Sequence, residues 1–175
     1  ISLADMDYVS WRKSLQKDAD ILELLTLMVG DITPEHDLKL QELLKIIDDK
    51  INHPINESNK KIIIFTAFAD TAGYLYDNVS TYVKTKYGLN TAMVSGMVEG
   101  RTTCPNLKKD LNTVLTCFSP ISKDKKLLMP NDDTEIDLLI ATDCISEGQN
   151  LQDCDYLINY DIHWNLSLIH ISEPT

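Results

Sequence analysis

The run Ile62-Ile63-Ile64-Phe65 restricts the fold more than any other feature of this sequence. It is short, continuous and rich in β-branched residues, which is typical of a strand buried on both faces of a parallel sheet. Similar apolar segments predict further strands at Thr91 to Val94, Ile136 to Ala141 and Tyr156 to Tyr160. Helical patterns separate the first three strands, and this alternation predicts an α/β fold with a parallel sheet flanked by helices.

Two helices are predicted between these strands. Asp70 to Tyr87 carries apolar residues at helical spacing and is followed by Gly88, a residue type that commonly ends helices. Pro105 to Phe118 forms the second predicted helix, and residues 119–135 are predicted to form a polar loop. We expect Asp70 to cap the first of these helices rather than to contact a ligand.

Residues 1–59 have a helical pattern of their own. Asp18 to Val29 carries a broad apolar stripe that is followed by Gly30, and Thr33-Pro34 is a favourable helix start. The polar segment 57–61 marks a predicted domain boundary. The predicted organisation is a helical lead-in segment at 1–59, a sheet-containing domain at 60–165 and a tail at 166–175.

Charge and composition exclude several classes of protein. The 16 Lys and Arg residues against 27 Asp and Glu residues give a net charge of −11, which argues against a free-standing nucleic-acid binder. The apolar runs are too short to span a membrane, so no membrane partner is expected. The cysteines, Cys104, Cys117, Cys144 and Cys154, form no C-x-x-C pair. We therefore expect packing cysteines, no metal site and a reducing, cytoplasmic setting.

Ligands of open parallel sheets bind beyond the carboxyl ends of the strands, so the residues that follow each strand form the candidate site. The four strand exits begin with Thr66, Ser95-Gly96, Thr142 and Asp161. Their hydroxyl, carboxyl and glycine residues suit a phosphate-bearing ligand. The sequence contains neither G-x-x-x-x-G-K-[ST] nor G-x-G-x-x-G, so we do not expect these 175 residues alone to cradle a triphosphate.

Several segments resemble motifs of superfamily 2 helicases. IDLLIATDCISEGQNLQDCDYLINYDIHWN (136–165) resembles motif V and, more narrowly, looks like the Swi/Snf-like bacterial helicases. KIIIFTAFADTAGYL (61–75) resembles motif IV, and AMVSG (92–96) resembles the short motif between them. The segment ITPEHDLKLQELLKII (32–47) resembles the lead-in to the same lobe. The order and spacing of these motifs match the family over residues 60–165.

The resemblance implies the second, C-terminal lobe of a motor with two RecA-like lobes. In this family ATP binds in the cleft between the lobes, and nucleic acid runs across both. The first lobe of the same chain, an implied partner, brings the phosphate loop and holds most of the ATP and Mg. The resemblance therefore implies an ATP-dependent helicase or translocase, and it implies that this fragment is inactive by itself.

The resemblance also implies roles for individual residues. The implied nucleic-acid contacts are Thr66, Ser95, Gly96 and Thr142. Gly148 and Asn150 are implied at the nucleotide cleft, where the glycine lets the backbone approach closely and the asparagine offers a polar group. Plainer interpretations stay open, because Thr66 could simply end a strand and Gly148 could be a turn glycine. We expect His163 and Trp164 to pack near a loop.

The sequence departs from the family after Asn165. Family members continue with proline and then a Q-R-x-G-R-x-x-R stretch, whose arginines face the ATP γ-phosphate and stabilise the charge that develops there. In this chain no arginine follows Arg101, so no catalytic residue is assigned. We interpret residues 60–165 as an incomplete lobe and residues 166–175 as a non-native tail.

A second hypothesis is a non-enzymatic α/β binding or protein-interaction module that docks through its acidic helical part. Such a module needs neither a phosphate loop nor an arginine motif. Under the helicase hypothesis the partner is nucleic acid. No base-reading element is identifiable, and DNA is preferred over RNA as the expected substrate.

Overall fold

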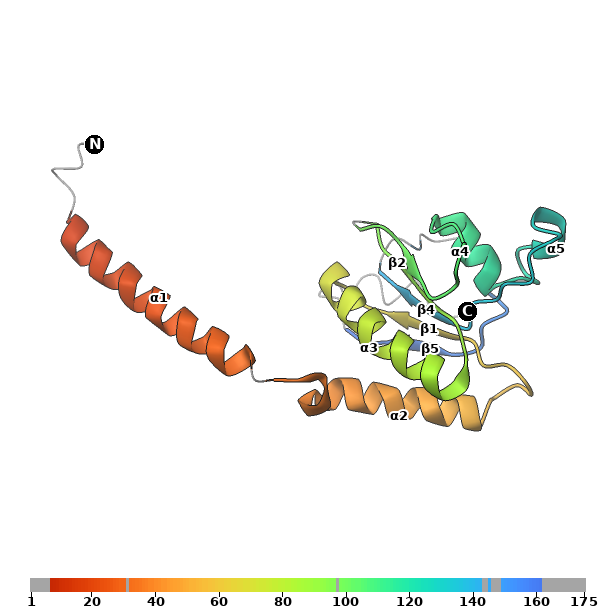
Figure 1. The fold of residues 1–175 in the computed structure, drawn as a ribbon, viewed down its shortest axis with the longest axis horizontal. Helices are drawn as coiled ribbons and strands as arrows, with labels where there is room; N and C mark the ends of the chain where they lie inside the picture. Colours follow the sequence, from red (N-terminus) through yellow and green to blue (C-terminus); the bar gives the residue numbers. More distant parts are fainter. Residues whose placement is uncertain (1–6, 31, 97, 143–144, 146–148, 162–175) are drawn as a thin grey trace, which may run out of the picture. The chain divides into compact units, whose positions relative to one another are not determined.

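The computed structural model describes residues 7–30, 32–96, 98–142, 145 and 149–161 (Figure 1). Contacts divide the chain into two compact units, Ile1–Glu42 and Leu43–Thr175. The described elements are, in chain order, α1 (Tyr8–Gly30), the 3₁₀ helix η2 (Pro34–His36), α2 (Leu38–Asn52), β1 (Ile62–Phe65), α3 (Ala69–Tyr87), β2 (Thr91–Val94), β3 (Arg101–Thr102), α4 (Leu111–Phe118), α5 (Lys125–Leu128), β4 (Leu138–Ala141) and β5 (Leu157–Asn159).

The first unit contains α1, η2 and the start of α2. Helix α1 confirms the helix predicted over Asp18 to Val29, although it begins earlier, at Tyr8, and has no buried residue. The predicted helix start at Thr33-Pro34 opens only the short turn η2. Helix α2 starts later because the carboxylate of Asp37 accepts hydrogen bonds from the backbone N–H groups of Lys39 and Leu40, both at 3.0 Å.

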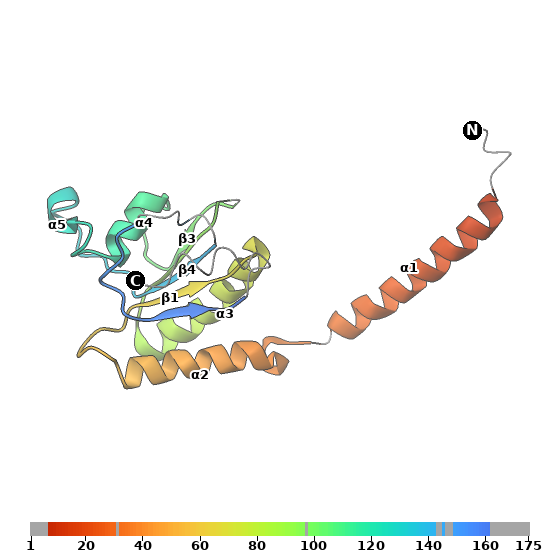
Figure 2. The same ribbon diagram turned by 180° about the vertical axis from the view of Figure 1, so that it is seen from behind.

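The second unit is built on a five-stranded sheet in the order β3-β2-β4-β1-β5 (Figure 2). Strands β1, β2, β4 and β5 run parallel, and the short β3 pairs antiparallel with β2. Strand β4 lies between β1 and β2, so Leu139 faces Ile63 on one side and Ala92 on the other. This architecture confirms the predicted α/β fold with a parallel sheet, and adds the two-residue strand β3.

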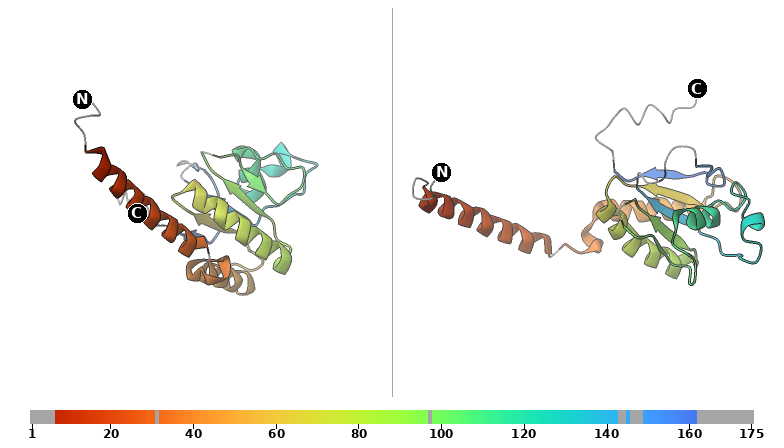
Figure 3. Two further views of the ribbon diagram at one scale, coloured as in Figure 1. Left: turned by 60° about the vertical axis from the view of Figure 1, so that its left-hand side comes forward. Right: turned by 90° about the horizontal axis from the view of Figure 1, so that it is seen from above.

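Helices cover both faces of this sheet, with α3 on one side and α4 on the other (Figure 3). Alternate residues of each strand point to opposite faces, which is why β1 and β4 are apolar throughout. The α4 side forms one buried cluster that includes Ile63, Val94, Leu139, Phe118, Cys104 and Cys117. Burial raises the pKa of the Cys104 and Cys117 thiols, which fits their expected role in packing.

Helix α3 confirms the predicted helix and its end. Gly88 follows it with φ +71°, a left-handed conformation that favours glycine. The expected capping role of Asp70 was wrong, because Phe68 occupies the N-cap position and Asp70 lies in the first turn. A carboxylate in that turn still interacts favourably with the positive end of the helix dipole.

The region between β3 and β4 differs from its predicted structure. Helix α4 begins at Leu111 rather than Pro105, because Asp110 caps it by accepting a hydrogen bond from the Thr113 N–H at 3.0 Å. Asn106, inside the predicted helix, has φ +65°, which no α-helix contains. The predicted loop at 119–135 contains the short helix α5.

A polar cluster joins α2 to the end of α3. The carboxylate of Asp48 accepts hydrogen bonds from the Tyr82 hydroxyl at 2.7 Å, the Tyr87 hydroxyl at 2.8 Å and the Lys86 ammonium at 2.6 Å. Burial raises the pKa of Asp48, but these three donors outweigh it and hold the pKa below its ordinary value. The cluster therefore favours the ionised carboxylate in the folded state.

An ion pair joins α2 to the start of β5. The Lys50 ammonium lies 2.7 Å from the Asp155 carboxylate, with side-chain exposures of 1% and 14%. Asn56 also donates a hydrogen bond to Asp155 at 2.7 Å. Burial acts to raise the pKa of Asp155, yet the nearby Lys50 ammonium and the hydrogen bond from Asn56 lower it overall.

The deeper burial of Lys50 than of Asp155 gives a prediction for the stability of variants of this ion pair. Asp155→Ala should lower the free energy of unfolding by about 3 kcal/mol, because it leaves the buried Lys50 ammonium without its counter-ion. Lys50→Met should cost less, since methionine fills the space without a charge and Asp155 keeps Asn56 and some solvent. Urea denaturation measures both losses, with Asn56→Ala as the control for the lost amide hydrogen bond. Equal losses for the two variants would contradict this account.

The Asp48 cluster gives a pH prediction. A carboxyl group whose pKa is lower in the folded state adds stability above its unfolded pKa, and this stability is lost as pH falls through the folded value. Asp48→Asn should therefore flatten the loss of stability between about pH 5 and about pH 3. The control is Asp133→Asn, which changes an exposed carboxylate. The control should keep the wild-type pH dependence of stability in denaturant titrations. The expectation fails if Asp48→Asn keeps it as well.

Candidate functional site at the carboxyl edge of the sheet

The structure brings three predicted site residues to one edge of the sheet. Thr66, Ser95 and Thr142 directly follow β1, β2 and β4, which are neighbours and run parallel. Backbone hydrogen bonds extend the ladders past the strand ends, from Thr66 N–H to the Ala141 carbonyl at 3.0 Å and from Thr142 N–H to the Val94 carbonyl at 3.3 Å. The parallel pairing of short strands thus aligns these exits side by side.

Thr66 is buried, with 3% exposure, and its hydroxyl donates a hydrogen bond to the Asp161 carboxylate at 2.5 Å. The Tyr160 N–H donates to the Phe65 carbonyl at 2.7 Å, which holds the β5 exit beside the β1 exit. The Thr66 hydroxyl therefore joins two strand exits. The sequence pattern places Asp161 at the fourth exit, but only the folded arrangement shows its partner.

The other predicted nucleic-acid contacts differ in exposure. Thr142 is buried, and its carbonyl accepts a hydrogen bond from the Ile145 N–H at 3.4 Å. Ser95 is half-buried, and Gly96 is exposed in a bend directly after it. Among the described residues predicted to contact nucleic acid, Ser95 and Gly96 are thus more exposed than Thr66 and Thr142.

Of the two residues predicted at the nucleotide cleft, the structure describes only Asn150. Gly148 lies outside the described residues. Asn150 is exposed, and its side-chain oxygen accepts a local hydrogen bond from the Gln152 N–H at 3.4 Å. The neighbouring Gln149 accepts a hydrogen bond from Lys123, which precedes α5, at 2.6 Å. These described contacts hold Asn150 in a turn and do not link it to the strand exits.

An exposed aromatic side chain stands next to the Thr66 exit. Phe68 is 57% exposed and occupies the N-cap position of α3. Its side chain has no hydrogen-bond acceptor, so it cannot satisfy the N–H groups of the first turn of α3. The signal for this feature in the sequence is a large aromatic residue between a buried strand and a helix, where Ser, Thr, Asp or Asn is usual.

A hollow of about 520 Å³ lies between the start of α3 and the β2–β3 connection. Arg101 lines it, stacks on the Tyr76 ring at 4.4 Å and pairs with Asp77 at 2.5 Å. The hydrogen bond to Asp77 raises the pKa of the guanidinium. Asp70 and Glu99 also line the hollow, so its carboxylates outnumber its one cation.

Two kinds of feature are absent from the part of the chain that the structure describes. It contains no group of three or more His, Cys, Asp or Glu side chains that could hold a metal ion. None of its helices combines the length and the apolar character that crossing a bilayer requires.

Most of the chain matches a known protein family. The family described as "Helicase conserved C-terminal domain" matches residues 38–172. This chain belongs to the helicase C-terminal domain family. The five-stranded sheet with helices on both faces is consistent with the RecA-like lobe that the motifs predict.

One curated relative is "Probable ATP-dependent RNA helicase ddx51" of Dictyostelium discoideum, which is 31% identical over 147 residues. The aligned region covers 82% of this chain and 22% of the relative, so the chain spans about a fifth of that protein's length. The helicase assignment is thereby supported. Membership of the Swi/Snf-like bacterial subgroup stays a prediction.

The region that matches the helicase family extends beyond the predicted domain at residues 60–165 in both directions. It begins at Leu38, the first residue of α2, within the segment predicted as a helical lead-in. It ends at residue 172, within the segment predicted as a non-native tail. Residues 162–175, including His163 and Trp164, lie outside the described part of the structure, and the predictions for them stay predictions.

The Thr66–Asp161 contact gives a prediction for this edge. Thr66→Val keeps the shape of the side chain but removes the buried donor to the Asp161 carboxylate, so unfolding free energy should fall by about 1–3 kcal/mol. Thr66→Ser retains the hydroxyl and should recover more than half of this loss in urea denaturation. If serine and valine behave alike, the hydrogen bond has no such role.

Proposed function

We propose that this helicase C-terminal domain is the second motor lobe of an ATP-dependent RNA helicase and contacts single-stranded RNA at the carboxyl edge of its sheet. The observation that carries the proposal is the alignment of Thr66, Ser95 and Thr142 at adjacent exits of parallel strands. Ligands of open parallel sheets bind beyond this edge. Family membership supports helicase function.

The strand contact would depend mainly on uncharged groups. Ser95 and Gly96 offer a hydroxyl and accessible backbone, and the start of the 19-residue helix α3 offers N–H groups to a phosphate. Exposed Phe68 beside them offers a surface on which a base can stack. Since acidic side chains line the nearby hollow, basic groups that attract the RNA backbone would come from outside this lobe.

ATP and Mg would be bound mainly by the first lobe. The described residues of this lobe contain no phosphate-binding loop, and exposed Asn150 offers one amide to a nucleotide held by the opposite lobe. When bound, ATP supplies through its hydrolysis the free energy for movement along the strand. The contribution of this lobe is to close over the nucleotide and to hold the RNA during each step.

RNA is proposed because the curated relative is named as an RNA helicase. The initial preference for DNA has no support from the comparisons. The alternative of a non-enzymatic binding module predicts no nucleic-acid-dependent ATP hydrolysis, and the two hypotheses can be separated by one assay.

The assay measures ATP hydrolysis by a chain that joins this lobe to a phosphate-loop lobe, with single-stranded RNA or DNA added. RNA should stimulate hydrolysis more than DNA of the same sequence. Ser95→Ala should raise the RNA concentration needed for half-maximal stimulation about tenfold, because it removes a hydroxyl hydrogen bond to a charged phosphate. Thr81→Ala, which removes an exposed hydroxyl on α3 that bonds to the Asp77 carbonyl, is the matched control.

Three results would count against the proposal. Equal stimulation by RNA and DNA would overturn the choice of RNA. Equal effects of the Ser95 and Thr81 variants would overturn the assignment of the carboxyl edge. Hydrolysis that neither nucleic acid changes would favour the binding module.

A further inference from the structure

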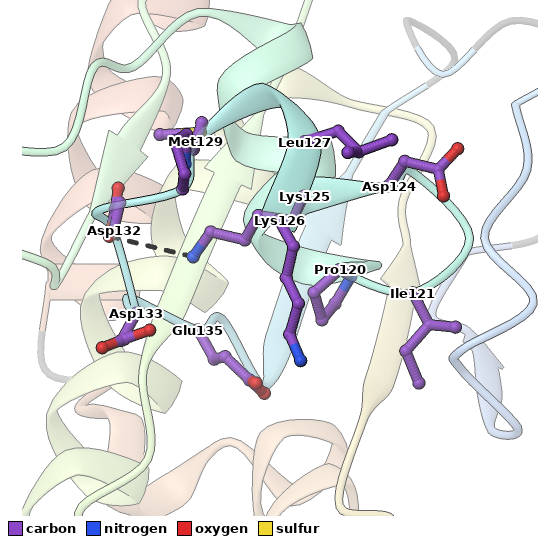
Figure 4. A pocket seen from close by; sticks show the side chains of 11 residues that line it. Pro120, Ile121, Asp124, Lys125, Lys126, Leu127, Met129, Asp132, Asp133 and Glu135 are labelled. Atoms are coloured by element: carbon purple, nitrogen blue, oxygen red, sulfur yellow. Dashed lines mark ion pairs between the residues drawn. The ribbon is translucent and has the colours of Figure 1, made fainter.

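A groove of about 550 Å³ lies at the opposite end of the sheet from the strand exits. It is formed by α5 and by the chain that leads into β4 (Figure 4). Its lining combines apolar side chains with carboxylates, and includes Ile121, Leu127, Met129, Asp124, Asp133 and Glu135. Glu135 precedes the first residue of β4 by three positions, whereas Thr142 follows its last residue. The groove therefore belongs to the amino end of the sheet.

A buried lysine holds this groove in shape. Lys125 is 4% exposed, and its ammonium donates a hydrogen bond to the Thr134 carbonyl and lies 3.8 Å from the Asp132 carboxylate (Figure 4). Asp132 in turn accepts a hydrogen bond from the Thr134 N–H at 2.7 Å. The charge of Lys125 is thus compensated within the groove wall and does not contribute a free cation to a ligand.

The rim that remains is acidic and apolar. Asp124, Asp133 and Glu135 are exposed, and the exposed cation that lines the groove is Lys126. The Glu135 carboxylate also lies 3.5 Å from the Lys61 ammonium, which leaves Asp124 and Asp133 as the main acidic groups of the rim. Leu127, on α5, is 83% exposed, a large fraction for a leucine that lines a concave surface. Ile121, at the same groove, is equally exposed. Apolar residues gathered at a groove with a polar rim are typical of a site for another protein.

We propose that this groove, defined by the eleven residues that line it from Pro120 to Glu135, binds a basic amphipathic peptide segment of a partner protein. Apolar side chains of the segment would cover Leu127 and Ile121, and its Lys or Arg side chains would face Asp124, Asp133 and Glu135. The charge of the rim selects this partner. Nucleic acid would meet excess carboxylates, and a second copy of this chain carries a net charge of −11.

The position of the groove has a consequence for the motor. A partner bound at the amino end of β4 leaves Ser95 and Thr142 at the carboxyl end uncovered. The partner and RNA would therefore bind this lobe at the same time. Such a site suits a protein that recruits or retains the helicase without competing for its strand.

The test uses the 175-residue chain and two labelled peptides in fluorescence anisotropy. One probe is an amphipathic helical peptide of Leu and Arg, about 12 residues long, and the other replaces each Arg by Glu. The Leu–Arg peptide should bind with saturation, and the Leu–Glu peptide should bind at least about tenfold more weakly. Leu127→Ser and Asp133→Lys should each weaken binding of the Leu–Arg peptide about tenfold.

The matched control is Leu128→Ser, which changes the next residue of α5. Leu128 is 67% exposed but does not line the groove, so this variant should bind the Leu–Arg peptide as the wild type does. Equal losses for the Leu127 and Leu128 variants, equal affinity for both peptides, or no binding of either would overturn the proposal. Displacement of the peptide by single-stranded RNA would also overturn it, because the two ligands would then share a site.

Discussion

The parallel pairing of β1 with β4 is the interaction on which the rest of this lobe depends. Ile62, Ile64 and every residue of β4 are fully buried, and each strand has only four residues. Strands this short and apolar are stable only when both faces are covered, so α3 and α4 must pack on opposite sides. The same pairing fixes where the chain leaves the sheet, and it therefore positions Thr66 beside Thr142.

This arrangement divides the lobe into two ends with different chemistry. The carboxyl end gathers hydroxyls, the start of α3 and exposed Phe68, and it suits the phosphates and bases of a single strand. The amino end is stabilised by charged contacts such as Lys50 with Asp155, and it carries the acidic groove beside α5. One short sheet can thus serve a motor at one edge and a partner protein at the other.

Features with a strong local signal could be predicted from the sequence. The β-branched runs predicted the strands because a short segment that is apolar on both faces has few stable structures other than a buried strand. Gly88 predicted the end of α3 because glycine readily adopts the left-handed conformation that ends this helix. Helix α5 was missed because Lys125 and Lys126 give its single turn a polar pattern, although folding buries Lys125. The Thr66–Asp161 contact joins residues 95 positions apart, and no local pattern encodes such a distance.

The most direct measurement is photo-crosslinking of single-stranded RNA that contains 4-thiouridine to this lobe joined to a phosphate-loop lobe, followed by mass spectrometry of the peptides. The account predicts crosslinks in peptides that contain Phe68 and Ser95, at the carboxyl edge of the sheet. Peptides from the groove, which contain Leu127, should remain unmodified. Crosslinks concentrated at α5, or an absence of crosslinks at the strand exits, would contradict the claim that this edge carries the RNA.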